Sequence, residues 1–500
     1  MLAEPTIPVW PRAEVAALCA GAATVVVVVM AVAAYEPAAG LGILAASIVL
    51  AIVVARPVRA AFLYLAATPL IAGLPRGGAI PQVRPSEALL ALLLAGVGLR
   101  LLTEGLGGHR PQQLRDYRVT SLDRSILAMA VLGSFVPLLW RAARGYRPLV
   151  DDLLYATTLW KYLLVFVLFR LVIFDEQQVR TCVNIMLGAG IIVGAIAIAQ
   201  AVNAPVVPGL LAALQDEPLQ AVTNNRGSST LGTSHGVADV MAFNLAFTLS
   251  FWWLRIGPRW LSASGACFFG LACLASGQFS AAVAVAVVTV TFGVLVGRPW
   301  RMLAAAVPAS LVAGASLWPV LEARLNSTDA SGVPESWAAR RFNLTNYFWP
   351  ELFRDGNWIL GVRPAGRLPS FEPWREWVYI ESGHTWLLWT GGVPLLLAFL
   401  WLSWGAARGT LALADRPRWA GPGRSSATTR FGSALGLATA PAFAVVFVLM
   451  LFDIHLTLRG PADALFPLLA LLTVPALWPD HSTYRRALLG RPLVRKGWWS

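Results

Sequence analysis

The residues best suited to chemistry stand where polar segments pass into long apolar runs. One such segment, ESGHTWLLWTGG, places Glu381 and His384 at the start of an apolar helix. Arg340 and Arg341 stand together in SWAARRF, and Arg226 precedes another apolar run in NNRGSSTLG. Forked guanidinium donors match phosphate oxygens in pairs, and an imidazole titrates near neutral pH. These residue types suggest diphosphate recognition combined with proton transfer.

Each of these residues also has a simpler interpretation. The arginine pair could contact lipid headgroups or an internal carboxylate, and His384 could be a hydrogen-bonding residue at a helix end. Glu381 could cap the helix, whose dipole favours negative charge there. The Gly/Ser/Thr-rich loop after Arg226 could present N–H groups to an anion, although such loops usually form caps and turns. The residue types alone leave both interpretations open.

The composition places these residues on a membrane protein. Of 500 residues, 57% are hydrophobic and 13% charged, mean hydropathy is +0.64, and the apolar residues form long runs. A net charge of +13 would suggest nucleic acid for a soluble chain, but here the arginines cluster in short links between apolar runs. We therefore expect a lipid bilayer and no nucleic acid as partner. The cysteines lie in apolar runs and the histidines lack metal-ligand spacing, so neither a disulfide nor a metal site is expected.

The apolar runs predict an all-α polytopic membrane protein, because a spanning helix needs about 20 apolar residues. About 14 transmembrane helices (12–14) are expected by this criterion, with one large outer-face loop carrying interfacial helices. The expected spans are 15–35, 39–55, 59–74, 86–103, 125–140, 153–174, 180–201, 236–254, 259–275, 278–296, 302–320, 384–404, 431–452 and 461–478.

The arginine distribution predicts an orientation with both termini in the cytoplasm, since most arginines then lie in internal links. One outer link, RAARGYRPLVDD at 141–152, departs from this rule because it carries three arginines. Inside the expected span 153–174, Arg170 is expected to snorkel to the membrane surface, and Lys161 either snorkels or is functional.

Five segments follow from this orientation. They are N-terminal helices at 1–140, core helices at 141–320 with an outer loop at 202–235, a large periplasmic or extracellular loop at 321–383, C-terminal helices at 384–478 and a basic cytoplasmic tail at 479–500. A loop as long as 321–383 is uncommon unless it is functional. Within it, SWAARRFNLTNYFWPELF predicts an amphipathic helix along the interface. Its many aromatic residues could pack together, anchor the loop at the bilayer or stack on sugars.

These segments resemble the O-antigen ligase and O-antigen polymerase superfamily over roughly residues 150–405. RGSSTLGTSHGVA resembles that family's Arg-x-x-Gly-Thr-Phe-Gly-x-Pro-Asn-x-x-Ala stretch. The matching positions are Arg226, Thr230, Gly232 and Ala238, whereas Ser229, Ser234 and His235 stand where Gly, Pro and Asn are usual. The long loop is similar to the family's periplasmic loop, with Arg340 or Arg341 at its arginine position. ILGVRPAG resembles its Leu-x-Gly-x-Gly-Pro-Gly stretch, with Arg363 replacing a glycine.

Two departures from the family pattern concern the proposed chemistry. The helix that follows the loop begins in the family with His or Asp, followed by Tyr three residues on and Gly eleven residues on. Counting back from Gly392 places Glu381 at the His/Asp position, whereas a one-turn deletion places His384 there. Gly277 and Gln278 stand where the family often has Ser-Arg.

The resemblance implies a bacterial enzyme of the cytoplasmic (inner) membrane that acts at its outer face in surface polysaccharide synthesis. It would transfer or polymerise glycan from an undecaprenyl-diphosphate-linked oligosaccharide onto a hydroxyl of a glycan or lipid acceptor, without metal or other cofactor. Arg226 and Arg340 or Arg341 would stabilise the charge that develops on the leaving diphosphate. His384 would act as general base, with Glu381 either orienting it or acting itself.

Two other functions would require different sequence features. A transporter or flippase for lipid-linked glycans should show internal repeats and paired broken helices. No convincing repeat is present, and the charge is concentrated in one outer loop. A metal-dependent lipid-linked glycosyltransferase should carry acidic ligands in its first outer loop, where this chain has only Glu36.

Overall fold

The computed structural model forms two compact units. It describes residues 37–77, 82–107, 117–215, 226–318, 322, 335–414, 427–478 and 481–488. The first unit comprises Met1–Ala60 and Leu89–Pro111, and the second comprises Ala61–Ala88 and Gln112–Ser500. The expected span at 15–35 and most of the basic tail lie outside the described residues.

The first unit consists of α2 (Pro37–Ala55) and most of α4 (Pro85–Leu106). The two helices approach closely at Gly96, where an added Cβ would stand 2.7 Å from Val53 Cγ1. Within α4, Arg100 Nε donates to Glu104 Oε1 one turn later, at 2.6 Å. The pair neutralises a cation in an otherwise apolar helix.

The second unit contains the remaining elements and all of the candidate site residues. Its membrane-type helices are α3 (Val58–Ile71), α6 (Ser121–Leu132), α7 (Phe135–Ala143), α8 (Val150–Ala156), α9 (Thr158–Val172), α10 (Glu176–Ala201), α13 (Ser234–Leu254), α14 (Arg259–Ala275), α15 (Phe279–Leu295), α16 (Pro299–Ser316), α21 (Gly383–Ala414), α23 (Ala427–Leu449) and α24 (Pro461–Leu471). Shorter helices are α11 (Val207–Leu214), η1 (Ser229–Leu231), η4 (His455–Thr457), η5 (Pro475–Leu477) and α25 (His481–Leu488).

The chain is an α-helical, multi-pass membrane protein. Among the described residues, 7 helical segments are long and apolar enough to cross a membrane, and several shorter apolar helices accompany them. Each expected span other than 15–35 overlaps a helix. The structure does not confirm 14 spans, because helices such as α14, α15 and α24 are shorter than that criterion requires. The orientation and the cytoplasmic placement of both termini stay predictions.

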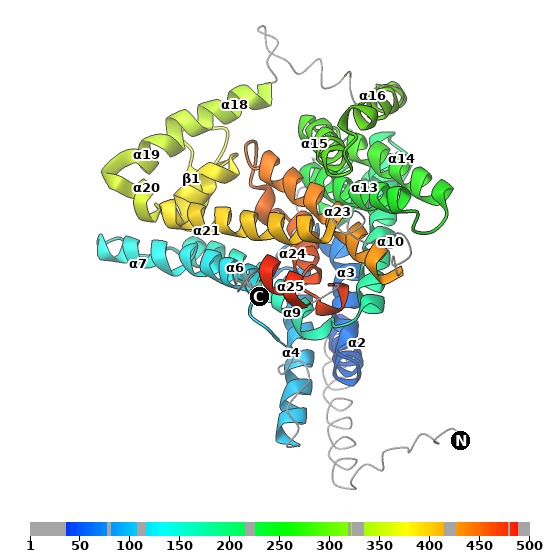
Figure 1. Ribbon diagram of the computed structural model, residues 1–500. Coiled ribbons are helices and arrows are strands. Elements are labelled where there is room, and N and C mark those ends of the chain that lie inside the picture. The colour runs from blue at the N-terminus through cyan, green and yellow to red at the C-terminus, as the bar shows by residue number, and fades with distance from the viewer. Residues whose placement is uncertain are drawn as a thin grey trace, which may run out of the picture. The chain divides into compact units, whose positions relative to one another are not determined.

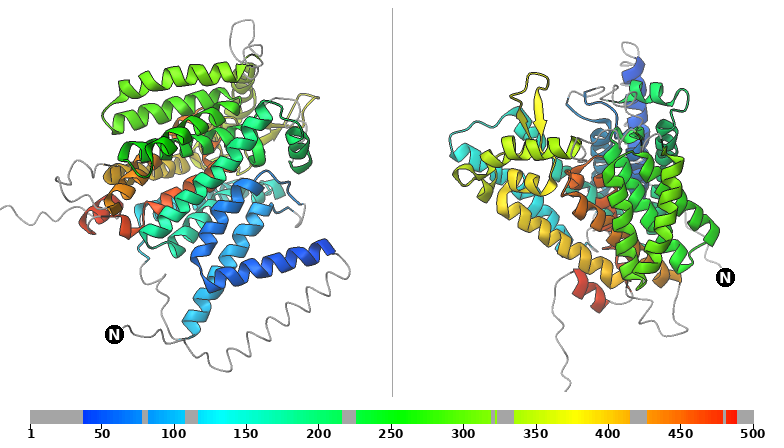
Figure 2. Two further views of the ribbon diagram at one scale, coloured as in Figure 1. Left: turned by 90° about the vertical axis from the view of Figure 1, so that its right-hand side faces the viewer. Right: turned by 90° about the horizontal axis from the view of Figure 1, so that it is seen from above.

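Helix α13 forms the centre of the second unit. It packs against α14, α15, α23 and α24, and large side chains such as Phe243 and Phe247 are fully buried on it. Helices α14, α15 and α16 lie side by side in a layer next to it (Figure 2). The polar first turn of α13 is thereby held at the end of a tightly packed helical bundle.

Helix α21 is interrupted where the long loop docks against it. Gly392 has φ +66°, and a Cβ there would lie 2.2 Å from the carbonyl oxygen of Ile359. Only glycine fits so close an approach. Pro394 then removes one backbone donor, and the carbonyl of Trp389 accepts the N–H of Val362 at 2.6 Å. The break therefore fixes the end of the loop against α21.

The described part of the long loop forms a small set of helices and strands, in which α20 (Asn357–Leu360) packs against α21 and α7. It contains α18 (Glu335–Asn343), the π-helical turn η2 (Leu344–Phe348), α19 (Trp349–Phe353), η3 (Arg354–Gly356), α20 (Asn357–Leu360), β1 (Arg367–Pro369) and β2 (Trp377–Tyr379). The two strands are antiparallel, with Leu368 opposite Val378. The helix predicted for SWAARRFNLTNYFWPELF is present as α18–η2–α19 (Figure 1). Its position along a membrane interface stays a prediction.

Candidate functional site

Arg340 and Glu381, which the sequence places far apart, meet at the end of the long loop. Arg340 Nε lies 3.9 Å from Glu381 Oε2, and Asn343 Nδ2 donates to the same oxygen at 3.5 Å. Arg340 and Asn343 stand one turn apart on α18, so both reach Glu381, two residues before α21 begins. Burial raises the pKa of Glu381, and the positive charge of Arg340 offsets this only in part. The carboxyl therefore binds a proton more readily than an exposed glutamate does.

His235, in the first turn of α13, lies on the other side of Arg340. Its Nε2 stands 3.4 Å from Arg340 Nη2 and 3.8 Å from Asp453 Oδ2, which precedes η4. The ring is three-quarters buried, with 24% of the side chain exposed. His235 is thus the histidine that the structure brings to the loop arginine.

A fully buried carboxylate–imidazole pair stands behind His235. Asp239 Oδ2 lies 2.6 Å from His455 Nδ1, and neither side chain is exposed. The ring of His455 meets that of His235 edge to face, with centroids 6.2 Å apart. Burial lowers the pKa of His455, but the charge of Asp239 and its hydrogen bond outweigh this, so the pKa lies above its usual value. His455 Nε2 and Asp239 Oδ1 have no hydrogen-bond partner in the described part of the chain.

Arg226 approaches this cluster from the loop that precedes α13. It is close enough to His235 to act on it electrostatically, and burial lowers the pKa of its guanidinium. The loop is held by backbone contacts: Gly227 N–H donates to Ala275 at 3.0 Å and Gly73 N–H donates to Thr230 at 2.9 Å. The backbone that follows Arg226 is therefore held at the ends of α3 and α14.

The remaining predicted site residues lie elsewhere. The ring of His384 packs edge to face against Phe399 and Phe447, with centroids 6.2 and 5.9 Å away, between α21 and α23. Arg341 is exposed on α18. Of the five predicted residues, Arg340 contacts both His235 and Glu381, and Arg226 acts on His235 electrostatically, whereas His384 faces aromatic side chains. Which residue acts as base stays a prediction.

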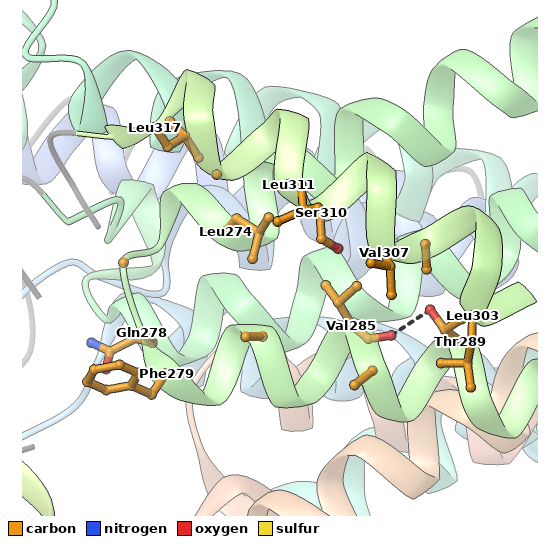
Figure 3. A pocket seen from close by; sticks show the side chains of 15 residues that line it. Leu274, Gln278, Phe279, Val285, Thr289, Leu303, Val307, Ser310, Leu311 and Leu317 are labelled. Carbon is orange, nitrogen blue, oxygen red and sulfur yellow. Dashed lines mark hydrogen bonds between the residues drawn. The ribbon is translucent and has the colours of Figure 1, made fainter. Parts of the chain in front are cut away.

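An apolar cavity of about 380 Å³ lies between α14, α15 and α16 (Figure 3). Aliphatic side chains such as Leu274, Val307 and Leu311 line most of it, and Gln278 stands at one end. Gln278 Nε2 also donates to Ser234 Oγ, the neighbour of His235. The cavity thus runs from the edge of the polar cluster into the helical layer.

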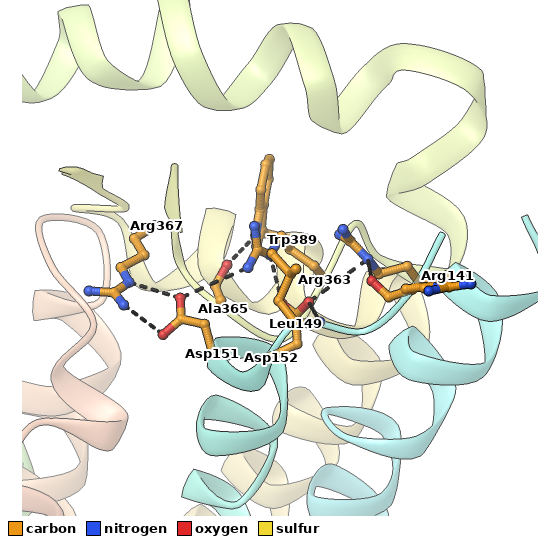
Figure 4. A network of polar contacts seen from close by, with 9 residues as sticks. Arg141, Leu149, Asp151, Asp152, Arg363, Ala365, Arg367 and Trp389 are labelled. Atoms are coloured by element: carbon orange, nitrogen blue, oxygen red, sulfur yellow. Dashed lines mark hydrogen bonds and ion pairs between the residues drawn. The ribbon is translucent and has the colours of Figure 1, made fainter. Parts of the chain in front are cut away.

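A second arginine–carboxylate network anchors the long loop (Figure 4). Arg363 Nε donates to Asp152 Oδ1 at 2.7 Å, and Arg367 donates to both oxygens of Asp151 at 2.8 and 2.7 Å. Trp389 Nε1 donates to the carbonyl of Ala365 at 2.9 Å. Arg363 and Arg367 thus tie the loop to the first turn of α8, where the arginine-rich link at 141–152 ends.

Both cations inside the expected span 153–174 are paired within the protein. Lys161 Nζ lies 2.9 Å from Asp463 Oδ1, which also accepts from the hydroxyl of Tyr64 at 2.7 Å. Arg170 is buried 3.5 Å from Asp123 Oδ2 and donates to the carbonyl of Arg118. The expectation that Arg170 snorkels is therefore wrong, because an internal carboxylate and a carbonyl take the place of headgroups.

Within the described residues, no group of three His, Cys, Asp or Glu side chains could hold a metal ion. The imidazoles and carboxylates of the cluster instead contact one another and Arg340. The guanidinium groups of the cluster can hold anionic oxygens, and its carboxyl and imidazole groups can exchange protons.

The chain matches no protein-family model, and no curated protein matches it either. The resemblance to the O-antigen ligase and polymerase superfamily therefore stays a prediction that rests on the quoted motifs.

Sequence reasoning missed His235, Asp239, Asp453 and His455 as members of the site. The histidines had been set aside because they lack metal-ligand spacing. Two signals point to these residues: Asp239 is an acidic residue inside an apolar helix, and Asp453 and His455 follow an apolar span directly. Ionisable groups inside membrane helices are rare and mark functional or paired positions.

Proposed function

We propose that this protein is a metal-independent membrane glycosyltransferase of the O-antigen ligase or polymerase type. It transfers or polymerises glycan from an undecaprenyl-diphosphate-linked donor onto an acceptor hydroxyl, at the outer face of a bacterial cytoplasmic membrane. One observation carries the proposal: Arg340 lies between His235 and Glu381, and Arg226 is near enough to act on His235 as well, at the junction of apolar helices and the long loop. A lipid-linked diphosphate needs cations at this boundary, because its headgroup lies in water and its chain in hydrocarbon.

The reaction requires little more than charge stabilisation and one proton acceptor. The acceptor hydroxyl oxygen attacks the anomeric carbon of the donor sugar, and the bond from that carbon to the diphosphate oxygen breaks. The bonding electrons leave with the polyprenyl diphosphate, whose added negative charge Arg226 and Arg340 stabilise. The hydroxyl proton passes to a base on the protein.

Glu381 is the base that the geometry favours. It lies beside Arg340, and the raised pKa of its carboxyl increases its basicity over that of an exposed glutamate. His384 remains the competing candidate from sequence alignment. Its aromatic surroundings at Phe399 and Phe447 suit a packing role better.

The polyprenyl chain of the donor has a suitable place in the apolar cavity between α14, α15 and α16. Gln278 at one end of that cavity bonds to Ser234, directly before His235. A donor whose chain lies in this cavity would hold its diphosphate next to the arginines. Burial of hydrocarbon would supply affinity, and the guanidinium groups would set its position.

A transfer assay with the purified protein in nanodiscs tests the proposed base. The assay supplies the donor as undecaprenyl-diphosphate-linked oligosaccharide and follows release of the diphosphate carrier. Glu381→Gln should abolish transfer, whereas His384→Gln should retain most of it while the protein stays folded. The reverse pattern would assign the base to His384. Full activity in both variants would contradict the proposed site.

Deletion of the gene with gel analysis of surface glycans tests the reaction class. If the deletion strain still attaches single glycan units to its surface acceptor but has lost long chains, the protein is a polymerase. If full-length chains remain on the lipid carrier, it is a ligase. Unchanged glycans would overturn the proposal.

A transporter for lipid-linked glycans is the second candidate. The buried pair of Lys161 and Asp463, joined by Tyr64, favours it, because such groups inside membrane helices often serve transport. In the nanodisc assay a transporter would release no diphosphate carrier. It would instead move labelled lipid-linked glycan between the leaflets of a liposome.

A further inference from the structure

A cavity of about 530 Å³ with a mixed polar and apolar lining lies between α7 and the α19–α20 part of the long loop. We name it the α7–α20 cavity. It is lined among others by Trp140, Arg144, Asn346, Tyr347, Asn357 and Phe371. None of these residues belongs to the cluster around His235. One wall of the cavity is formed by the arginine-rich link at 141–152. This outer link departs from the rule that most arginines lie in internal links, and it has no role in the proposed transfer chemistry.

The walls of the α7–α20 cavity are tied together, so the space is a built feature. Arg144 Nη1 donates to Asn357 Oδ1 on α20, and Arg144 Nη2 lies 3.4 Å from Asp355. The guanidinium of Arg144 also lies over the rings of Trp140 and Tyr146, at 5.6 and 5.9 Å. Charge, hydrogen bonds and ring contacts thus fix α7 against the loop.

The lining chemistry suits a saccharide. Aromatic rings offer flat faces to the C–H faces of sugar rings, and amide and guanidinium groups offer donors to hydroxyl oxygens. Trp140 Nε1 is buried and has no hydrogen-bond partner in the described part of the chain. Tyr347 stacks on Phe371 at 5.1 Å, and Phe371 is 86% exposed. This mixture contrasts with the aliphatic cavity between α14, α15 and α16, which suits hydrocarbon.

The cavity is connected to the candidate transfer site by one helical path. Tyr347 follows Arg340 by seven residues along α18 and η2. At about 1.5 Å per residue, the two lie roughly 10 Å apart along the axis, a distance that a short oligosaccharide spans. Arg375 bridges them, because it donates to Asn343 at 2.9 Å and lies over the ring of Tyr347 at 5.6 Å.

We infer that the α7–α20 cavity is an oligosaccharide subsite, which holds glycan units distant from the bond being formed. This inference rests on the proposed glycosyltransferase function and adds where the chain of sugars lies. A subsite at this distance would favour oligosaccharides of several units over single sugars.

Direct binding, measured without transfer, tests the subsite. The probe is oligosaccharide released by mild acid from the lipid-linked glycan of the host cell, separated by size and labelled with a fluorophore. Full-length protein in nanodiscs is titrated with it and the change in anisotropy is followed. Trp140→Phe keeps the ring and removes the N–H, so affinity should fall about fivefold for one lost hydrogen bond. Phe371→Ala removes an exposed ring, so affinity should fall about tenfold.

The matched control is Trp358→Phe, which changes the same residue type on α20 outside the cavity lining. It should bind as the wild type does. Absence of oligosaccharide binding by the wild type, or equal binding by all three variants, would overturn the subsite.

Transfer measured on the same samples separates the two proposals. Binding that Trp140→Phe weakens, with no transfer in the wild type, supports the subsite and rejects the glycosyltransferase. Active transfer with unaffected binding rejects the subsite alone.

Discussion

Two groups of arginines in the second unit make contrasting contacts with acidic partners. In the loop anchor, Arg363 and Arg367 donate to Asp152 and Asp151 at 2.7 to 2.8 Å, and Asp152 is fully buried. In the candidate site, the nearest partners of Arg340 are at 3.4 and 3.9 Å, and its buried Nε has no hydrogen-bond partner in the described part of the chain.

The difference separates structural arginines from ones that are available to a ligand. A guanidinium in a short, buried pair has its donors occupied, and a ligand could bind it only by breaking that pair. Arg340 has unsatisfied donors near a partly exposed carboxylate, so anionic oxygens could improve its hydrogen bonding.

The largest effect is expected on stability, at the anchor. Arg363→Met removes the closer of two cations beside the buried Asp152 and leaves Arg141 at 3.8 Å. It should lower the free energy of unfolding by about 3 kcal/mol, the low end for breaking a buried pair. Fluorescence-monitored unfolding in nanodiscs measures the change. Arg354→Met is the control, because that exposed arginine pairs at the surface and its loss should cost at most about 1 kcal/mol. Combining Arg363→Met with Asp152→Leu should recover much of the loss. Equal effects of both arginines would remove the contrast.

The next effect is expected on activity, at the site. Arg340→Ala should lower the transfer rate by about 100- to 1000-fold, because it removes a donor that stabilises developing charge. Its unfolding midpoint should stay close to that of the wild type. Release of the polyprenyl diphosphate in nanodiscs measures the rate. A fall in stability that matches the fall in activity would make Arg340 a structural residue like Arg363.

A smaller effect concerns pH and the buried pair behind His235. The pKa of His455 is raised in the folded protein, so its pairing with Asp239 adds stability that is fully present below the unfolded pKa of about 6.5. This contribution is lost as pH rises through the higher folded pKa. Asp239→Asn should therefore cost about 1.5–3 kcal/mol at low pH, as expected for a hydrogen bond to a charged group, and less at high pH. Unfolding midpoints across pH measure it, and a loss independent of pH would contradict a charged His455.

The smallest effect is expected one residue from Arg340. Arg341 is exposed on the same helix, and Arg341→Ala should change transfer by about twofold or less, as expected of an exposed surface position. Both variants are compared in the same transfer assay. A loss as large as that of Arg340→Ala would assign the proposed charge-stabilising role to Arg341 as well and would contradict the geometric distinction.

Much of the helical architecture could be predicted from the sequence, whereas the partners of the polar groups could not. The apolar runs located the described helices because spanning length and hydropathy are local properties. Their number was less secure, since α14 and α15 are short. Arg226, Arg340 and Glu381 were identified from residue type and loop position, and the structure brings them toward one cluster. Arg363 offered no comparable signal, because its partner Asp152 lies 211 residues away.

By itself the sequence determined that this chain is an α-helical membrane protein, because the free energy of transferring apolar residues from water to lipid adds up along contiguous segments. It also showed one long loop that is rich in polar residues. Only the tertiary structure decided which ionisable groups meet. Asp239 and His455 are 216 residues apart, and His235 and Arg340 are 105 apart. Such pairs form because the packing of α13 against α23 and α24 and the docking of the loop on α21 bring distant segments together. No local pattern specifies those contacts.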